Sequence, residues 1–203
     1  ANTYSGGTTL SGGYLTVGAT GALGSGAVTL NSGANRLVLG AGVTLDNDLV
    51  INGGVSPSAG WGAVTATGGG VLTGTIAING DAANGGHFRG GSGGSVLDIQ
   101  GAINSSVRVS LRAGDFLISG GGSYGLMDHG AGTVTLGAAD GISTSSAFRQ
   151  QVGWGTSVLD LAGFNQTLAG LASTGTGAGS VQNSGATTSV LTLNVADGDT
   201  QTY

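Results

Sequence analysis

The sequence predicts an all-β protein built as a parallel β-solenoid, on three observations. Short runs of alternating apolar and polar residues are separated by Gly, Asn, Asp or Ser, which is the pattern of strands with one buried face. Several of these runs resemble one another, as expected when each repeat of roughly 20 to 30 residues is one coil. The chain has 45 Gly and neither Lys nor Glu, so strong helix formers are scarce and we expect almost no helix.

The predicted strands follow one another along the whole chain. The first surround Leu10, Leu15 and Val17, and the later ones comprise residues 27–30, 36–45, 71–78, 95–103, 107–111, 132–137, 157–161 and 189–195. In a parallel solenoid each strand lies about 4.8 Å from its equivalent in the next coil, and Asn or Thr can form ladders between coils. At about 20 to 25 residues per coil, we expect roughly eight to ten coils and a rod of about 40 to 50 Å.

Internal similarity decides between two all-β architectures. Three runs share a Ser-Val-Leu start, at Ser95, Ser157 and Ser189. An antiparallel sandwich would also give short strands with frequent turns, but this self-similarity favours the solenoid. Because side chains alternate along a strand, we expect Leu159 and Leu161 to point into the core and Asp160 to point outward.

Composition limits the classes of partner. Leu, Ile, Val and Phe form about 24% of the chain, enough to build a core although Gly, Ser and Pro together reach about 33%. The net charge of −5 and five scattered Arg argue against nucleic acid and anionic membrane surfaces. The absence of Cys excludes disulfides and thiolate metal sites, and apolar runs of three residues are too short for a transmembrane helix.

Two pairs of carboxylates are candidates for catalysis or for calcium binding. Asp46 and Asp48 are two residues apart, as are Asp197 and Asp199, and such pairs could transfer protons or supply oxygen ligands. Their Gly, Asn and Ala neighbours favour turns instead. Residues 90–98 partly match a calcium-binding nonapeptide, but Ser95 replaces the required Asp. We therefore predict no catalytic residue, no cofactor and no metal site.

Aromatic and basic residues in Gly-rich segments are the candidate contacts with a ligand or partner. The two His residues, His87 and His129, lack metal-ligand spacing and are expected in solvated loops. Residues 85–94 are interpreted as a protruding loop in which Phe88 and Arg89 touch a partner. Trp61 and Trp154 share a Gly-Trp-Gly context. Each could stack on a sugar or seal an interface, or fill a gap where a coil is loose.

Two segments resemble a known repeat family. The sequence NTYSGGTTLSGGYLTVGATGALGSGAVTL at residues 2–30 is similar to the passenger-associated strand repeat of bacterial autotransporters, and so is SVLDLAGFNQTLAGL at residues 157–171. The resemblance implies a right-handed parallel β-helix, extracellular or on the bacterial cell surface, that serves as an adhesin, a stalk or a carrier of another activity. Tyr14 departs from the family, which usually has a small polar residue there.

The two ends of the chain carry similar residues. Thr3 and Tyr4 precede Ser-Gly-Gly, and Thr202 and Tyr203 close the chain. We therefore interpret residues 1–203 as a single β-solenoid module, one segment of a longer repeat protein or filament. Copies are expected to stack end to end, with Thr3, Tyr4, Leu10, Thr202 and Tyr203 at the junction.

The predicted function is that of an extracellular structural solenoid that builds or extends a bacterial surface fibre or stalk. The alternative is a glycan- or surface-binding adhesin that uses Trp61, Phe88, Arg89 and Trp154. A polysaccharide-degrading enzyme has the least support, because no acid and base constellation stands out.

Overall fold

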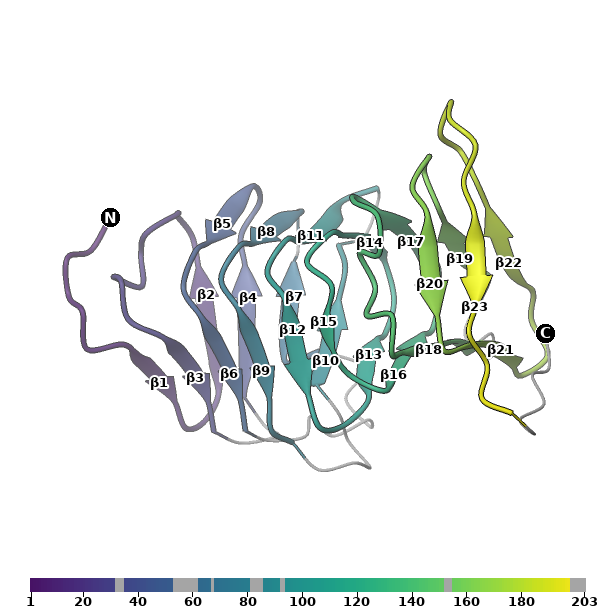
Figure 1. The fold of residues 1–203 in the computed structure, drawn as a ribbon. Helices are drawn as coiled ribbons and strands as arrows, with labels where there is room; N and C mark the ends of the chain where they lie inside the picture. The colour runs from purple at the N-terminus through teal and green to yellow at the C-terminus, as the bar shows by residue number, and fades with distance from the viewer. Residues whose placement is uncertain are drawn as a thin grey trace.

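The protein is a parallel β-solenoid, as the sequence predicts (Figure 1). The computed structural model describes residues 1–31, 35–52, 62–66, 68–80, 86–91, 94–151 and 155–197, without the side chains of residues 86 and 87. All of the regular structure in these ranges is β-strand. Figure 1 shows the coils following one another from the N-terminal to the C-terminal end of the molecule. Over the described residues, no helix is present that could span a membrane.

Four parallel sheets form the walls, and two of them begin near the N-terminus. Sheet A contains, in spatial order, β1 (Thr8–Leu10), β3 (Val28–Leu30), β6 (Leu49–Ile51), β9 (Ile76–Ile78), β12 (Ile103–Ser105) and β15 (Gly122–Ser123). Sheet B contains β2 (Tyr14–Val17), β4 (Arg36–Leu39), β7 (Val64–Ala66), β10 (Gly86–Arg89), β13 (Val109–Leu111), β16 (Leu126–His129), β18 (Ala147–Gln151) and β21 (Gly170–Thr174).

The other two sheets extend to the C-terminal end. Sheet C contains β5 (Val43–Leu45), β8 (Gly70–Leu72), β11 (Val96–Ile99), β14 (Asp115–Ile118), β17 (Gly132–Leu136), β19 (Ser157–Asp160) and β22 (Gly179–Gln182). Sheet D contains only β20 (Gln166–Leu168) and β23 (Leu191–Leu193). Because neighbours in every sheet come from successive coils, one turn of chain separates each pair of bonded strands.

Coil length varies along the solenoid. The sequence separation between residues in register ranges from 18, between Leu111 and His129, to 27, between Leu49 and Ile76. Sheet B has eight strands, which matches the lower limit of the eight to ten coils expected. Unequal coils make the repeat irregular, which explains why only a few segments of the sequence resemble one another.

The core consists of columns to which each coil contributes one apolar side chain. In sheet A, Val28, Leu49, Ile76 and Ile103 are in register and at most 1% exposed. In sheet C a similar column contains Leu45, Leu72, Ile99, Ile118 and Leu136. Each added coil therefore buries apolar surface against the coil before it, which is the main favourable term in folding.

Side-chain ladders also join the coils on the outside. Asn79 Nδ2 donates to Asn52 Oδ1 at 3.1 Å, and Asn52 Nδ2 donates to Asn31 Oδ1 at 3.0 Å. The three residues follow β9, β6 and β3 at equivalent positions. The expected laddering of Asn between coils is therefore confirmed at this corner.

Leu159 and Leu161 are buried, as the alternation predicts, at 0% and 5% exposure. Asp160 lies in register with Thr135, which faces outward from β17, and with Gln182, but it is only 5% exposed. Gln182 Nε2 donates to Asp160 Oδ2 at 2.9 Å, and the next coil covers the carboxylate. Burial raises the pKa of Asp160, but hydrogen bonds from Ser184, Gln182 and Ala162 outweigh burial and hold it below its usual value.

A column of glycines marks the corner between sheets C and A. Gly74, Gly101 and Gly120 follow β8, β11 and β14 in successive coils. A Cβ atom on Gly101 would overlap the carbonyl oxygen of Gly74, and one on Gly120 would overlap that of Gly101. The backbones of three coils therefore approach so closely at this corner that only hydrogen fits.

The substitution Gly101→Ala is expected to lower the free energy of unfolding by about 1–3 kcal/mol, because the backbone must move to relieve the overlap. Gly125→Ala is a matched control, because a Cβ atom at Gly125 has no neighbour within 4 Å. Urea unfolding followed by circular dichroism would measure both variants. Equal stabilities for the two would contradict the close approach of the coils.

Candidate functional site

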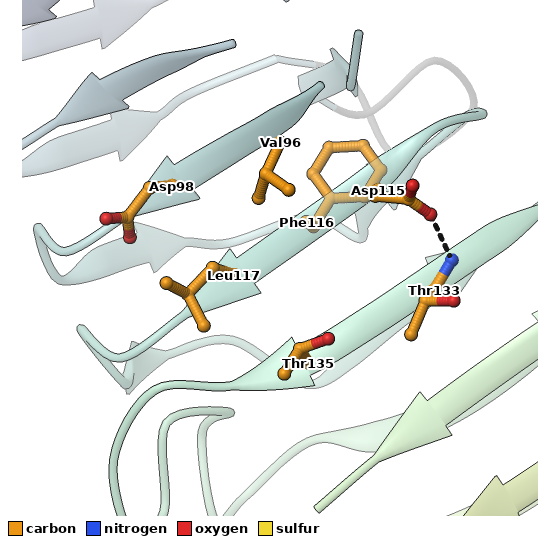
Figure 2. Close-up of a pocket in the computed structure, with 7 residues that line it drawn as sticks. All are labelled: Val96, Asp98, Asp115, Phe116, Leu117, Thr133 and Thr135. Atoms are coloured by element: carbon orange, nitrogen blue, oxygen red, sulfur yellow. Dashed lines mark hydrogen bonds between the residues drawn. The ribbon is translucent and has the colours of Figure 1, made fainter. Parts of the chain in front are cut away.

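A groove with polar groups around it lies on the outer face of sheet C. Its volume is about 530 Å³, within the range of small-molecule sites. Three successive strands, β11, β14 and β17, form it (Figure 2). The lining residues are Val96, Asp98, Asp115, Phe116, Leu117, Thr133 and Thr135.

Strand alternation explains why polar and apolar groups share this face. Leu97 and Phe116 are in register and 0% exposed, so their neighbours along each strand point outward. On the outer face, Val96 pairs with Asp115, and Asp98 pairs with Leu117. Val96 is 38% exposed. The floor of the groove is therefore apolar, with hydroxyls along one side.

The two carboxylates lie at opposite ends of the lining in Figure 2, with Val96 between them. Asp115 Oδ1 accepts a hydrogen bond from Thr133 N at 2.9 Å. Asp98 Oδ2 accepts one from Gln100 Nε2 at 2.7 Å, whereas Asp98 Oδ1 is enclosed and has no hydrogen-bond partner. Within the described ranges the ion pairs involve Asp128 alone, so no cation neutralises Asp98 or Asp115.

A second polar cluster lies inside the solenoid. The core column of sheet B begins with the apolar residues Leu15, Leu37, Val64, Phe88 and Leu111 and continues with the polar residues His129, Gln150 and Ser173. His129 Nδ1 and Ser157 Oγ share a hydrogen bond of 2.7 Å. Gln150 Nε2 donates to the carbonyls of Ser157 and Ser180, both at 2.9 Å. This polar cluster thus crosslinks sheets B and C through the interior.

The buried environment keeps His129 neutral. Burial lowers the pKa of His129 from its ordinary value of 6.5 to about 4, against opposing effects of the Gly114 and Ala131 carbonyls and of Asp115. His129 and Ser157 are each 0% exposed, so a substrate has no access to them. The pair therefore stabilises the core and does not form a nucleophilic site. The expectation that His129 lies in a solvated loop is wrong, because it occupies a core position of β16.

A charged cluster covers the outer face of sheet B. Arg149 Nε and Nη2 donate to the two oxygens of Asp128 at 2.7 and 2.8 Å. Arg108 Nη1 lies 3.3 Å from Asp128 Oδ2, and Gln151 Nε2 donates to the same oxygen at 3.1 Å. The hydrogen bond to Asp128 raises the pKa of Arg149. With Asp128 only 1% exposed, these contacts tie three coils together and leave no carboxylate oxygen open to a ligand.

Of the sequence-predicted contact residues, the structure describes Phe88 and Arg89. Phe88 belongs to β10 and is 0% exposed, so the prediction that it contacts a partner from a protruding loop is wrong. Arg89 is half-buried at the end of the same strand. Trp61 and Trp154 lie outside the described residues, as does the side chain of His87.

The predicted carboxylate pairs lie apart from the groove. Asp46 and Asp48 occupy the corner between β5 and β6. Asp48 Oδ1 accepts hydrogen bonds from Thr75 Oγ1 at 2.7 Å and Thr75 N at 2.9 Å, which lower the pKa of Asp48. Asp197 follows β23, and Asp199 is outside the described residues. No group of three His, Asp or Glu residues in the described ranges could hold a metal ion.

At the N-terminal end, the first residues lie beside the following coil. Asn2 N donates to Gly21 O at 2.8 Å, and Ser25 N donates to Tyr4 O at 3.0 Å. Tyr4 is 41% exposed, and its hydroxyl shares a hydrogen bond of 2.7 Å with Thr8 Oγ1. The strands β1 and β2 are edge strands, and the inward residues Leu10 and Leu15 are only partly buried.

At the C-terminal end, β21, β22 and β23 are the edge strands. Val181 and Leu191 pack partly against the core, while Val190 and Leu193 are 55% and 43% exposed. Thr202 and Tyr203, the expected junction residues here, lie outside the described residues. Both described ends thus present unpaired strand edges next to partly exposed apolar side chains.

Sequence reasoning missed the groove, although part of the signal was present. Segment 95–103 was predicted as a strand with alternating faces, which places Asp98 outward. The strand β14, with its sequence DFLI, was not predicted. Without this strand, the positions of Asp115 and Leu117 beside Asp98 could not be predicted either. Comparisons with known proteins add no relative: no family model, no curated protein and no solved structure matches this chain.

Proposed function

We propose that this protein is a structural solenoid whose coils continue by end-to-end stacking, so that it builds or extends a fibre or stalk. The observation that carries the proposal is the pair of open ends. Edge strands β1 and β2 at one end, and β21, β22 and β23 at the other, each have a strand partner on one side only. Such edges favour the addition of another strand.

The apolar columns support the same proposal. Leu10 and Leu15 begin the columns that continue with Leu30 and Leu37, which are at most 1% exposed. At the opposite end, Val181 continues the column of Leu159 and is also only partly buried. A further coil at either end would bury these side chains at about 25 cal/mol per Å² of apolar surface and would add a ladder of backbone hydrogen bonds.

The further coil would belong to the same polypeptide or to a second copy of this chain. Stacking of copies would be heterologous, with the C-terminal end of one on the N-terminal end of the next, and such contacts give open filaments. We propose an extracellular or bacterial cell-surface location, on the resemblance of residues 2–30 and 157–171 to autotransporter repeats. The proposed role is structural and requires no catalytic residue.

Leu10→Asp is expected to weaken self-association at least about tenfold, because a carboxylate would be buried between stacked coils. Thr9→Asp is the matched control, because Thr9 is exposed on the same strand and points outward. Sedimentation velocity over a range of protein concentrations would measure association, and negative-stain microscopy would show filament length. Thermal unfolding of both variants would establish that each remains folded.

Three results would contradict stacking of separate copies. The first is a wild-type chain that stays monomeric at the highest concentration reached. The second is equal weakening of association by Thr9→Asp and Leu10→Asp. The third is a set of closed dimers in place of open filaments, because a closed dimer requires an isologous interface.

A surface-binding adhesin is the second candidate function, and the groove on sheet C is the described surface that it would use. Among the residues that line the groove, Phe116 is the only aromatic one, and it is 0% exposed. The groove therefore offers no ring on which a sugar could stack. A glycan array would test the sugar-binding form of this proposal.

A further inference from the structure

We propose that the groove on sheet C binds a linear molecule with an ammonium group at each end of an apolar chain, that is, a diamine or polyamine. The groove lies on the side of the solenoid, away from the edge strands at its ends, so this inference does not depend on stacking. It rests on the charge of the lining, on the apolar floor and on the separation of the two carboxylates.

Charge complementarity selects a cation. The titratable side chains of the lining are Asp98 and Asp115, and no Arg or His belongs to it. Each carboxylate accepts one hydrogen bond, Asp98 from Gln100 and Asp115 from Thr133, but neither is in an ion pair with a described residue. A cation in the groove would be attracted to both of these unbalanced negative charges. An anionic ligand would meet only repulsion here.

The apolar floor between the carboxylates favours a ligand whose middle part is apolar. Leu117 lies in register between Asp98 on one side and Thr135 on the other, and Val96 is 38% exposed beside it. An alkyl chain laid on these groups would bury apolar surface from both molecules. A bare metal ion or a small hydrophilic cation would leave this surface exposed.

The distance between the two carboxylates favours a ligand with two positive charges that are well separated from each other. Asp98 and Asp115 lie on adjacent strands, offset by two residues, which separates their Cα atoms by about 8 Å. Their carboxylates turn toward opposite ends of the groove in Figure 2. They therefore do not converge on one point, as ligands of a single metal ion would. One ammonium group can reach each carboxylate only if an extended chain joins the two.

Binding should be modest and sensitive to salt, because both carboxylates are partly solvated. A charge pair in such a position changes affinity by up to about fivefold. Salt at physiological strength screens charges beyond about 8 Å, so the titration belongs in low-salt buffer near pH 7. The groove has space for the ligand without rearrangement of the sheet.

The test is to titrate the full chain separately with hexamethylenediamine, hexylamine and hexanediol. Binding is measured by calorimetry and by the chemical-shift changes of Leu117 and Val96. The diamine is expected to bind about fivefold more tightly than the monoamine, and the diol is expected not to bind. In Asp98→Asn and in Asp115→Asn the advantage of the diamine over the monoamine should disappear. Leu117→Lys, which places an ammonium group in the groove, should abolish binding of both amines.

Asp46→Asn is the charge-matched control, because Asp46 is exposed and lies in a different corner of the coil. It should leave the ratio of the two affinities unchanged. The proposal is overturned if the diamine and the monoamine bind equally to the wild-type chain, or if neither binds at millimolar concentration. It is also overturned if Asp46→Asn lowers the ratio as much as Asp98→Asn, because that result would mean a general attraction to an acidic protein.

Discussion

Replacing Leu159 with alanine is expected to lower the free energy of unfolding by about 2–5 kcal/mol. Leu159 is 0% exposed and belongs to a core column of sheet C, between Val134 and Val181. Alanine would leave a cavity that the neighbouring coils cannot close without breaking register, because both flanking strands are bonded to β19. The loss of unfolding free energy should therefore lie in the range found for buried Leu-to-Ala substitutions whose cavity stays open.

Val158→Ala is the matched control for this prediction, because Val158 is the next residue on the same strand and faces outward with partial exposure. Val158→Ala should lower the free energy of unfolding by well under half as much as Leu159→Ala. Chemical denaturation of both variants would give the two free energies. A loss at Leu159 no greater than that at Val158 would show that the strand does not have the register described.

Acidification from pH 6.5 to about 4 is expected to destabilise the protein by about 3 kcal/mol through His129 alone. The pKa of His129 is lowered in the folded protein, so between these values the unfolded chain binds a proton that the folded chain does not. Stability from this residue is thus fully present above pH 6.5 and is lost as the pH falls toward 4. Further acidification would add the losses from Asp48 and Asp160, whose pKa values are also lowered.

The surroundings of His129 explain why protonation is so unfavourable. The rings of Phe116 and Phe148 lie with their centroids 6.0 and 6.4 Å from that of His129. Its Nε2 atom has no hydrogen-bond partner, and Asp115 is the nearby charge that favours protonation. A positive charge on His129 would be enclosed by Phe116 and Phe148, and only Asp115 would partly compensate it.

The double variant His129→Leu with Ser157→Ala should remove this part of the pH dependence, because replacing both members of a buried hydrogen bond avoids leaving one unsatisfied. His87→Asn is the control for the other histidine of the chain and should leave the pH dependence intact. Thermal unfolding at a series of pH values would measure each variant. A double variant with an unchanged pH profile would show that His129 does not titrate in this way.

The fold was predictable because the property that defines it is local. Alternation along a strand depends on neighbouring residues, so the burial of Leu159 and Leu161 could be read from the segment SVLDL. The burial of Phe88 and His129 could not, because the flanking glycines of β10 and β16 are equally typical of exposed loops. Their places in the core depend on register with Val64 and Leu111, which belong to other coils.

The groove was unpredictable for a related reason. Asp98 and Leu117 are 19 residues apart in the chain and become neighbours only through the pairing of β11 with β14. Coil length varies from one turn to the next, so no fixed period in the sequence relates the two positions. The acidic and apolar residues of the lining therefore look unrelated until the register is known.

The column-like arrangement of coils has a mechanical consequence. The backbone hydrogen bonds of every sheet point from one coil to the next, so tension between the two ends of the chain acts on the terminal coil first and breaks its ladders before those of the interior. A coil of 18 to 27 residues, once detached, can extend to roughly 60–95 Å. The molecule would therefore lengthen in steps under load and absorb work with each step, and the coils still wound would keep their shape.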